Sequence, residues 1–306
     1  MKNLSTVLAR MNLGRKSVIG IPMIWMVIFL FLPFAIVFYI SLTALAEGAS
    51  PPYTTIFAWT AEGFLTLTLN IGNYLRLAAD DLYLIAYGSS VGYALMTTFF
   101  CLLIGYPLAY SIARSDPAHR PIYLMLVIMP FWTSFLIRVY AWIGILKDNG
   151  FLNQILMGLR IIDDPLPILY TPLSVVIGMT YTYLPFMILP LYSNLEKFDT
   201  TLLEAAADLG AKPYKSWLKI TMPLSLPGIL AGSLLVFIPA CGEYVIPSLL
   251  GGPDSLMIGR TLVDEFFSNR DWPVASAVAI VLLVFLLVPI VWFQTLERQN
   301  NPKGAK

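Results

Sequence analysis

The chain has 306 residues; 58% of them are apolar and only 12% are charged, about half the charged fraction of soluble globular proteins. So few charges cannot cover the surface of a water-soluble protein of this size. Two cysteines exclude a disulfide scaffold, and the single histidine, His119, argues against a multi-histidine metal site. A net charge of +1 lacks the basic excess of nucleic-acid-binding proteins, so the sequence predicts an all-α membrane protein with no metal or nucleic acid bound.

Six stretches are long enough to cross a bilayer, which takes roughly 20 apolar residues. In chain order they are Val18–Thr43, Ala86–Ala113, Pro121–Leu146, Leu173–Leu195, Leu224–Leu250 and Trp272–Leu296. Backbone polar groups in lipid need internal partners, so each stretch is expected to be a transmembrane helix. Prolines inside them predict kinks, and the pairs Gly88–Gly92 and Gly228–Gly232 predict close helix packing.

The orientation follows from the basic residues in the loops. With the N-terminus inside, inner segments carry thirteen Lys and Arg residues and outer loops carry five, which predicts that both termini are cytoplasmic. The expected organisation is a cytoplasmic tail (1–17), a first transmembrane helix (18–43), a periplasmic loop (44–85), a five-helix permease core (86–296) with a cytoplasmic loop at 196–223, and a cytoplasmic tail (297–306). Short structured pieces at the membrane surface are expected within loop 44–85.

The outer loops also carry eleven acidic residues against five basic ones. A negative outer face would attract a cation or a basic partner. Chance loop composition is an equal alternative.

The inner loop 196–223 is predicted to form two short helices at a sharp angle. Thr201 and Glu204 have the spacing of a capping box, Gly210 is a natural stop, and Pro213 suits the start of the second helix. A bulky residue at Gly210 is expected to obstruct the turn. A solvated connector is the alternative, but it leaves the alanine-rich first helix unexplained.

Two charges, Arg138 and Glu243, fall inside spans, where each costs roughly 3 kcal/mol even on lenient scales. Glu243 faces the translocation path and meets the amine of a cation, or pairs with Arg138, or lies near enough to the outer helix end to extend its carboxylate toward the membrane surface. Arg138 is expected to be structural. Aromatic residues offer cation–π surfaces along the path, or serve as packing. They are Trp132, Trp142, Tyr181, Tyr183 and Tyr244.

No catalytic constellation stands out, and the chain has no Gly-Lys dipeptide, so the phosphate-binding Walker A pattern is absent. A membrane-embedded enzyme is therefore disfavoured. A secondary transporter working alone would be favoured by inverted repeats or more intramembrane charges, and neither is found.

A longer pattern in the inner loop resembles a known motif. Glu204-Ala205-Ala206, three residues, Gly210, nine residues and Ile220-Thr221-Met222-Pro223 resemble the EAA motif of ABC-importer membrane subunits, with Met222 where leucine is usual. Four other stretches resemble spermidine/putrescine permeases, and within that family the likeness is greatest to the putrescine permeases. They are Ser134–Trp142, Leu146–Gly150, Leu249–Asp254 and Asn269–Ala275.

The resemblance implies a type I ABC importer permease fold in the bacterial inner membrane, with no enzymatic activity in this chain. It implies that Glu204, Ala205, Ala206, Gly210 and Pro223 couple the chain to an ATPase. The implied partners are a second permease subunit, two ATPase subunits and a periplasmic polyamine-binding protein. ATP and Mg²⁺ would then belong to the ATPase, and this chain would need no cofactor. The implied cargo is a polyamine, with putrescine favoured over spermidine or another small solute.

Overall fold

A computed structural model describes residues 13–59, 65–253 and 255–300. The predicted cytoplasmic tails at 1–17 and 297–306 therefore lie partly outside the described residues. The chain divides into two compact units. One is formed by Met1–Ala79 with Glu265–Val281, and the other by Asp80–Asp264 with Leu282–Lys306.

The first unit begins with a continuous helical stretch made of α2 (Leu13–Met26), a π-helical turn η1 (Val27–Phe31) and α3 (Leu32–Ser41). Residues Val18–Ser41 are apolar and long enough to cross a membrane, and none of their most apolar window is buried within the chain. This helix coincides with the predicted first span, Val18–Thr43, to within two residues at its end. The π-helical turn comes just before Pro33, which cannot donate a hydrogen bond to the preceding turn.

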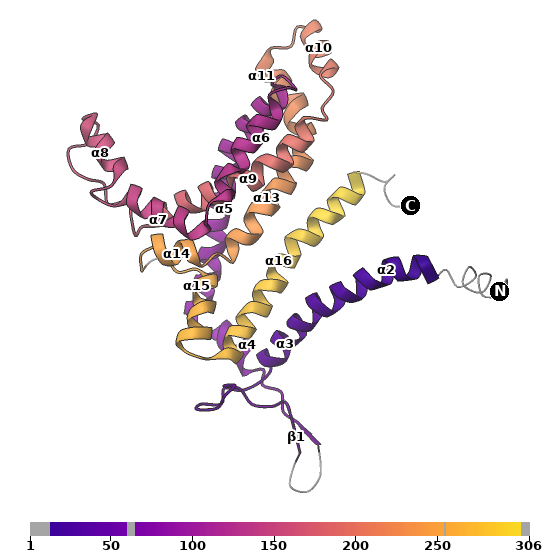
Figure 1. Ribbon diagram of the computed structural model, residues 1–306, viewed down its shortest axis with the longest axis vertical. Coiled ribbons are helices and arrows are strands. Elements are labelled where there is room, and N and C mark those ends of the chain that lie inside the picture. The colour runs from indigo at the N-terminus through magenta and orange to yellow at the C-terminus, as the bar shows by residue number, and fades with distance from the viewer. Residues whose placement is uncertain (1–12, 60–64, 254, 301–306) are drawn as a thin grey trace, which may run out of the picture. The chain divides into compact units, whose positions relative to one another are not determined.

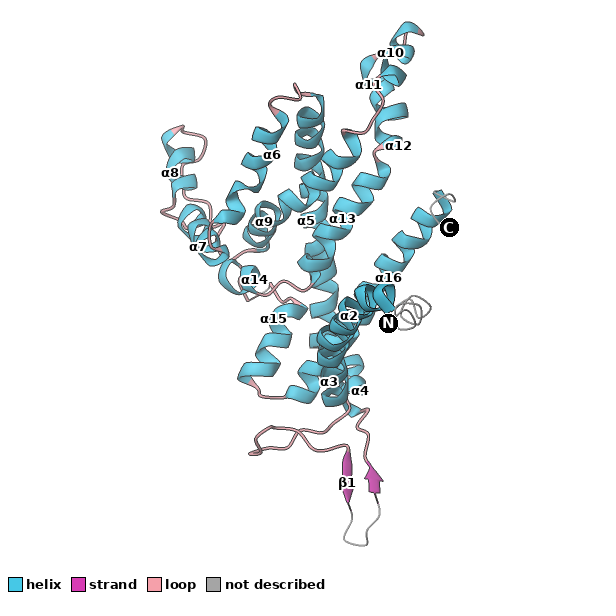
Figure 2. Cartoon of the chain, turned by 45° about the vertical axis from the view of Figure 1, so that its right-hand side comes forward, coloured by secondary structure: helices cyan, strands magenta, loops and turns pink. Residues whose placement is uncertain are grey.

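Short pieces of structure follow in the loop after α3. Strands β1 (Phe57–Trp59) and β2 (Leu65–Leu67) pair antiparallel, with Phe57 opposite Leu67, and helix α4 spans Gly72–Ala79 (Figure 2). The Asn73 side chain donates hydrogen bonds of 2.8 Å to the carbonyls of both Ser41 and Thr43, which ties α4 to the end of α3. The loop thus contains structured pieces, as expected; their position at the membrane surface stays a prediction.

Three long helices form the centre of the second unit. Helices α5 (Asp81–Arg114), α9 (Pro172–Leu195) and α13 (Leu226–Cys241) lie side by side (Figures 1 and 2). α5 begins where the Asp80 side chain accepts a hydrogen bond from the Leu82 amide, five residues before the expected start of the second span. α9 is the most buried candidate span, with 61% of its apolar window inside the protein.

One of the two Gly-x-x-x-Gly pairs explains how closely α13 packs on α9. A Cβ atom on Gly232 would lie 2.8 Å from Met187 Sδ, and one on Gly228 would lie 2.7 Å from Asn194 Cβ. A Cβ on Gly88 or Gly92 would meet nothing within 4 Å. The predicted close packing is therefore confirmed for Gly228 and Gly232, and is not found within the described chain for the other pair.

The third and fifth spans are broken, which corrects their predicted bounds. Helix α6 (Arg120–Ile128) and the 3₁₀ turn η2 (Met129–Trp132) are followed, after a bend of 89°, by α7 (Phe135–Leu146) and α8 (Phe151–Gly158). Pro130 lies in η2, where its missing N–H leaves the α-helical ladder interrupted. The expected kinks at prolines are present here as a complete break.

The fifth span ends at Cys241 rather than Leu250. Helix α11 (Pro213–Ser216), the π-helical turn η3 (Trp217–Thr221) and α12 (Met222–Leu224) run together and meet α13 at a bend of 63°. Residues Val245–Leu250 form a separate short helix, α14. Helix α15 (Ile258–Val263), the π-helical turn η4 (Asp264–Ser268) and α16 (Trp272–Asn300) complete the described chain. It holds four uninterrupted candidate spans, or six when each bent pair counts as one.

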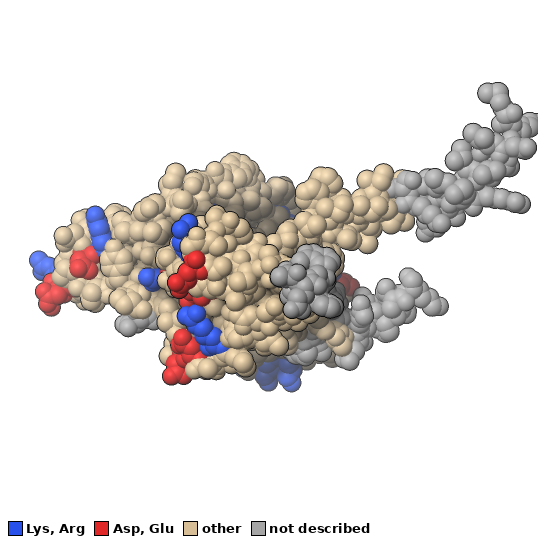
Figure 3. Space-filling model, turned by 90° about the horizontal axis from the view of Figure 1, so that it is seen from below, with Lys and Arg blue, Asp and Glu red and all other residues tan. Residues whose placement is uncertain are grey.

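The charged side chains on the face seen in Figure 3 are few, and acidic ones lie beside basic ones. Two ion pairs from the loops have this character: Arg76 to Asp271, at 3.2 Å, and Arg260 to Asp264, at 4.0 Å. These pairs use two of the five outer basic residues and leave the acidic excess counted from the sequence unchanged.

Candidate functional site

The segment with the EAA pattern forms a short helix, α10 (Thr201–Asp208), preceded by Thr200 at the N-cap. The carboxylate of Asp199 accepts a hydrogen bond of 3.0 Å from the Thr201 amide, and this bond lowers the pKa of Asp199 below its usual value. Thr201 is thus the first helical residue, and no side chain caps the helix from Thr200. The predicted capping box of Thr201 and Glu204 is wrong; Asp199 satisfies the first amide instead.

Gly210 ends α10 in the left-handed conformation, with φ of +76°. The Gly210 amide donates to the Ala207 carbonyl at 2.8 Å, and the Ala211 amide donates to the Ala206 carbonyl at 2.9 Å. These two bonds form a Schellman motif, so the predicted helix stop is confirmed. We expected a bulky residue at Gly210 to obstruct the turn, but a Cβ there would meet nothing within 4 Å. Glycine is favoured by the left-handed backbone conformation and not by crowding.

Most of the proposed coupling residues are accessible. Glu204, Ala205, Gly210 and Pro223 are exposed, whereas Ala206 is buried. Leu209, next to the turn, is 88% exposed. The segment therefore presents small, apolar and acidic side chains outward.

The bend between α12 and α13 is fixed by residues that the sequence did not single out. Ser225 Oγ lies 3.1 Å from Tyr106 Oη on α5 and donates to the Met222 carbonyl at 2.9 Å. The Tyr106 ring meets Trp217 edge to face at 5.7 Å. Only the prolines flanking Ser225, at 223 and 227, pointed to a bend here.

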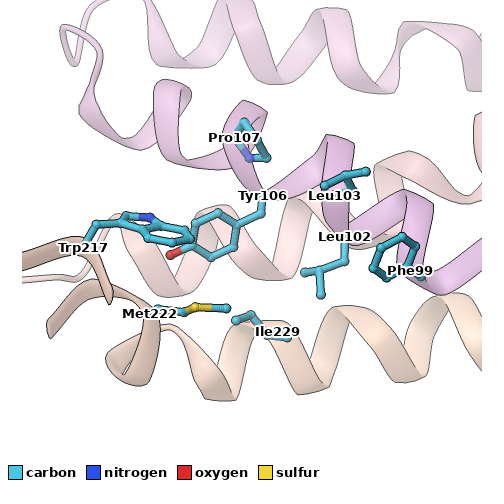
Figure 4. Close-up of a pocket in the computed structure, with 8 residues that line it drawn as sticks. All are labelled: Phe99, Leu102, Leu103, Tyr106, Pro107, Trp217, Met222 and Ile229. Carbon is cyan, nitrogen blue, oxygen red and sulfur yellow. The ribbon is translucent and has the colours of Figure 1, made fainter. Parts of the chain in front are cut away.

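An apolar groove of about 230 Å³ opens beside this bend. Figure 4 shows Tyr106 and Trp217 side by side over Met222 and Ile229. The full lining is Phe99, Leu102, Leu103, Tyr106, Pro107, Trp217, Met222 and Ile229. The groove lies between α5 and the segment that leads into α13.

Glu243 occupies the gap between α13 and α14. Its Oε1 accepts hydrogen bonds from the amides of Tyr244, Val245 and Ile246, at 3.1, 3.0 and 3.4 Å. The Tyr183 hydroxyl on α9 donates to Oε2 in a short hydrogen bond. The carboxylate thus satisfies the first amides of α14, and the alternative that it pairs with Arg138 is wrong.

The backbone around Glu243 is held from a second side. A Cβ on Gly259 of α15 would lie 2.4 Å from the Gly242 carbonyl oxygen. The α15 backbone therefore packs directly on the 242–243 segment, and only glycine allows this approach.

The other candidate aromatic residues are not gathered around Glu243. Tyr181 meets Trp142 edge to face at 5.4 Å, and both line a separate apolar pocket of about 340 Å³ with side chains from α5, α7 and α9. Trp132 is 72% exposed at the break of the third span, and Tyr244 is 45% exposed. Of the five aromatic candidates, Tyr183 bonds the Glu243 carboxylate through its side chain and Tyr244 through its backbone amide.

Arg138 lies against the rings of Phe131 and Phe135, with its guanidinium carbon 5.0 and 5.8 Å from their centroids. Its Nε and Nη1 atoms are buried and have no hydrogen-bond partner in the described chain. The side chain is thus half-buried among aromatic rings and is not neutralised by any residue that the structure describes.

Residues 101–299, which include the EAA segment, Arg138 and Glu243, match the sequence profile of the binding-protein-dependent transport system inner membrane components. The chain belongs to this family. It is 38% identical over 91% of its length to the spermidine/putrescine transport system permease protein PotB of Escherichia coli K12, of which it covers 96%. The PotB protein of Haemophilus influenzae is 37% identical over 95% of this chain and is covered over 97% of its own length.

More distant similarity extends to other cargoes. The molybdenum transport system permease protein ModB of Mycobacterium bovis is 30% identical over 66% of this chain and 74% of its own length. The relatives named PotB do not separate putrescine from spermidine.

Solved structures show the same fold at low sequence identity. A bacterial ABC transporter involved in the import of the acidic polysaccharide alginate has a chain with a TM-score of 0.70 at 16% identity, with 97% of this chain and 98% of that one covered. A chain of the MetNI methionine ABC transporter has a TM-score of 0.53 at 15% identity, covering 76% of this chain and 99% of that one. The chain therefore has the type I ABC importer permease fold. It is a multi-pass inner-membrane transport subunit and not an enzyme.

Proposed function

We propose that this chain is the permease subunit of an ATP-driven importer of polyamines, and of putrescine in particular. The observation that carries the proposal is the similarity to spermidine/putrescine permeases over nearly the whole of both chains. In the proposed assembly, the chain forms the translocation path with a second permease subunit. Two ATPase subunits bind on the cytoplasmic side, and a periplasmic binding protein delivers the polyamine.

We propose that α10 contacts the ATPase. The exposure of Glu204, Ala205 and Leu209 supports this, because the helix has small and apolar side chains available to a partner's groove. The Schellman turn at Gly210 fixes the angle between α10 and the continuous α11–η3–α12 segment. Closure of the ATPase would then displace that segment as a unit, and the Tyr106–Ser225 contact would pass the displacement to α5.

We propose that Glu243 meets the amine of the passing polyamine. Oε1 already accepts three amides, whereas Oε2 accepts only the Tyr183 hydroxyl, which leaves acceptor capacity on Oε2 for an ammonium group. Tyr183 would orient the carboxylate, and the exposed ring of Tyr244 lies next to it in the chain. The other aromatic candidates, Trp132 and Tyr181, would serve elsewhere on the path.

Uptake by the reconstituted complex tests the proposal. The test uses proteoliposomes that contain this chain, the second permease and the ATPase. With binding protein and labelled putrescine on one side of the membrane, putrescine should accumulate only when ATP is present on the other side, where the ATPase lies. Preferential spermidine uptake would transfer the assignment to the other polyamine. Uptake of molybdate but no polyamine would contradict the proposed cargo, and uptake without the ATPase would favour a secondary transporter.

A further inference from the structure

Arg138 lies deep in the expected membrane region, in the first turn of α7. Its amide donates to the Ser134 carbonyl at 3.2 Å, directly after the 89° break. The preceding α6 and η2 have nine and four residues, which advance the chain by roughly 20 Å at about 1.5 Å per residue. The hydrocarbon core is about 30 Å thick, so a chain that enters at the predicted inner surface with α6 reaches the break before the headgroup layer on the far side.

The guanidinium has no acceptor within the described chain. Nε and Nη1 are buried against the rings of Phe131 and Phe135, and no hydrogen bond or ion pair is formed by the third nitrogen, Nη2. The one acidic side chain within the predicted spans, Glu243, is already held by Tyr183 and three amides. Ring contacts stabilise a cation only in part, and an uncompensated charge at this depth is strongly unfavourable.

At membrane depth the acceptor must therefore come from outside the described chain, because the two carboxylates outside it, Glu62 and Asp254, fall in predicted outer loops. Nη2 is the open end of the guanidinium, because it is not among the buried nitrogens. The neighbouring side chains Trp132 and Ile137 are 72% and 67% exposed, so no described part of the chain covers this side of the break. A planar guanidinium is best matched by a carboxylate, which can accept two parallel N–H bonds.

We propose that Arg138 pairs with a carboxylate of the second permease subunit, at membrane depth. This inference rests on the proposed function in one respect, the existence of that subunit. A lipid phosphate is the less suitable acceptor, because phosphates lie at the boundary of the hydrocarbon core. The pair would make Arg138 a determinant of which permease this chain assembles with, since a buried cation rejects any partner lacking the matching anion.

Co-purification of the two permeases tests the pair. Arg138→Met should lower recovery of the second permease with this chain at least about tenfold, because a buried carboxylate is left unpaired. Lys147→Met removes the same charge from the exposed far end of α7 and should leave recovery unchanged. The yield of each variant expressed without the partner reports folding of this chain by itself.

A rescue experiment distinguishes pairing from misfolding. Each Asp and Glu within the predicted spans of the second permease is changed to Asn or Gln in turn and combined with Arg138→Met. One combination should restore recovery to within about twofold of wild type, because removing both charges of a buried pair is nearly neutral. Unchanged recovery with Arg138→Met, or no rescue by any substitution, would overturn the pair. The pair would also be overturned if Arg138→Met left recovery of the second permease unchanged but removed a bound anionic lipid seen by native mass spectrometry, because Arg138 would then bind the lipid. Failure of the unmodified permeases to co-purify would instead contradict the proposed assembly.

Discussion

Gly210 shows how a single backbone angle decides what an exposed turn tolerates. Its φ of +76° is strained for most residues, but the space around it is open. We therefore expect Gly210→Ala and Gly210→Leu to cost similar amounts, about 1–2 kcal/mol, and Gly210→Asn to cost less, since asparagine adopts the left-handed region more readily. ATPase retention and putrescine-stimulated ATP hydrolysis should follow the order Gly, Asn, then Ala and Leu together. A steady decline with side-chain size would show that crowding, and not φ, controls the turn.

Glu243 combines a capping role with the proposed contact to cargo, and three substitutions separate these roles. Tyr183→Phe removes the donor to Oε2 but leaves the three amides on Oε1. Assembly should be normal, and uptake should change about two- to tenfold, consistent with a lost hydrogen bond worth roughly 1 kcal/mol.

Glu243→Gln keeps an oxygen for the amides and removes the charge. It should assemble normally and lower polyamine uptake by more than Tyr183→Phe does. Glu243→Ala should in addition lower the melting temperature in detergent, because the α14 amides lose their acceptor. Wild-type uptake by Glu243→Gln would exclude the carboxylate from the path.

Single residues also show where sequence reasoning was sufficient. Gly210 and Pro213 were identified from the sequence because the end of one helix and the start of the next depend on local residues that favour particular φ values. The partner of Glu243 was not identified, because Tyr183 is sixty positions away and depends on the packing of α9 against α13. Thr201 and Glu204 had the capping spacing, but Asp199 lies two residues earlier and reaches the same amide.

At the level of elements, the two Gly-x-x-x-Gly pairs supply a matched comparison. Gly232→Ala places a Cβ 2.8 Å from Met187 Sδ and 3.1 Å from its carbonyl, and α13 must separate from α9 to admit it. Gly92→Ala meets nothing within 4 Å, and helix propensity favours alanine by about 1 kcal/mol. The melting temperature of the purified complex should fall for Gly232→Ala and stay equal or rise for Gly92→Ala. A fall for Gly92→Ala would place a partner helix on that face of α5.

The broken third span shows the limit of hydropathy at this scale. Pro121–Leu146 reads as one apolar stretch with a single charge, so length alone predicts one helix. The structure divides it at Thr133 and Ser134, where the Thr133 amide and hydroxyl both bond to the Pro130 carbonyl. Proline positions indicated kinks but not their size, because the angle depends on how α7 packs against α14 and α8.

For the whole molecule, the orientation is the remaining prediction on which coupling depends. Ser216 is 8% exposed, so its failure to react with a thiol reagent after conversion to cysteine would reflect burial as well as topology. Leu209, at 88% exposure, is the better inner position. In a background without Cys101 and Cys241, an impermeant reagent outside intact cells should label Ser50→Cys and Ser268→Cys but not Leu209→Cys. Labelling of Leu209→Cys only after permeabilisation would agree with thirteen inner and five outer basic residues; labelling from outside would reverse the orientation.

The first span and α9 differ in how strictly packing constrains their amino-acid sequences. None of the apolar window of Val18–Ser41 is buried within the chain, whereas 61% of that of α9 is. A helix that only has to be apolar accepts nearly any exchange among Leu, Ile, Val, Phe and Met, while one packed largely inside the protein is sensitive to a single methylene at its buried positions. Naturally occurring missense variants should therefore be more frequent in the first span than in α9, although both helices have 24 residues and both are apolar. Equal depletion of variants from both would show that another subunit constrains the first span as tightly as the bundle constrains α9.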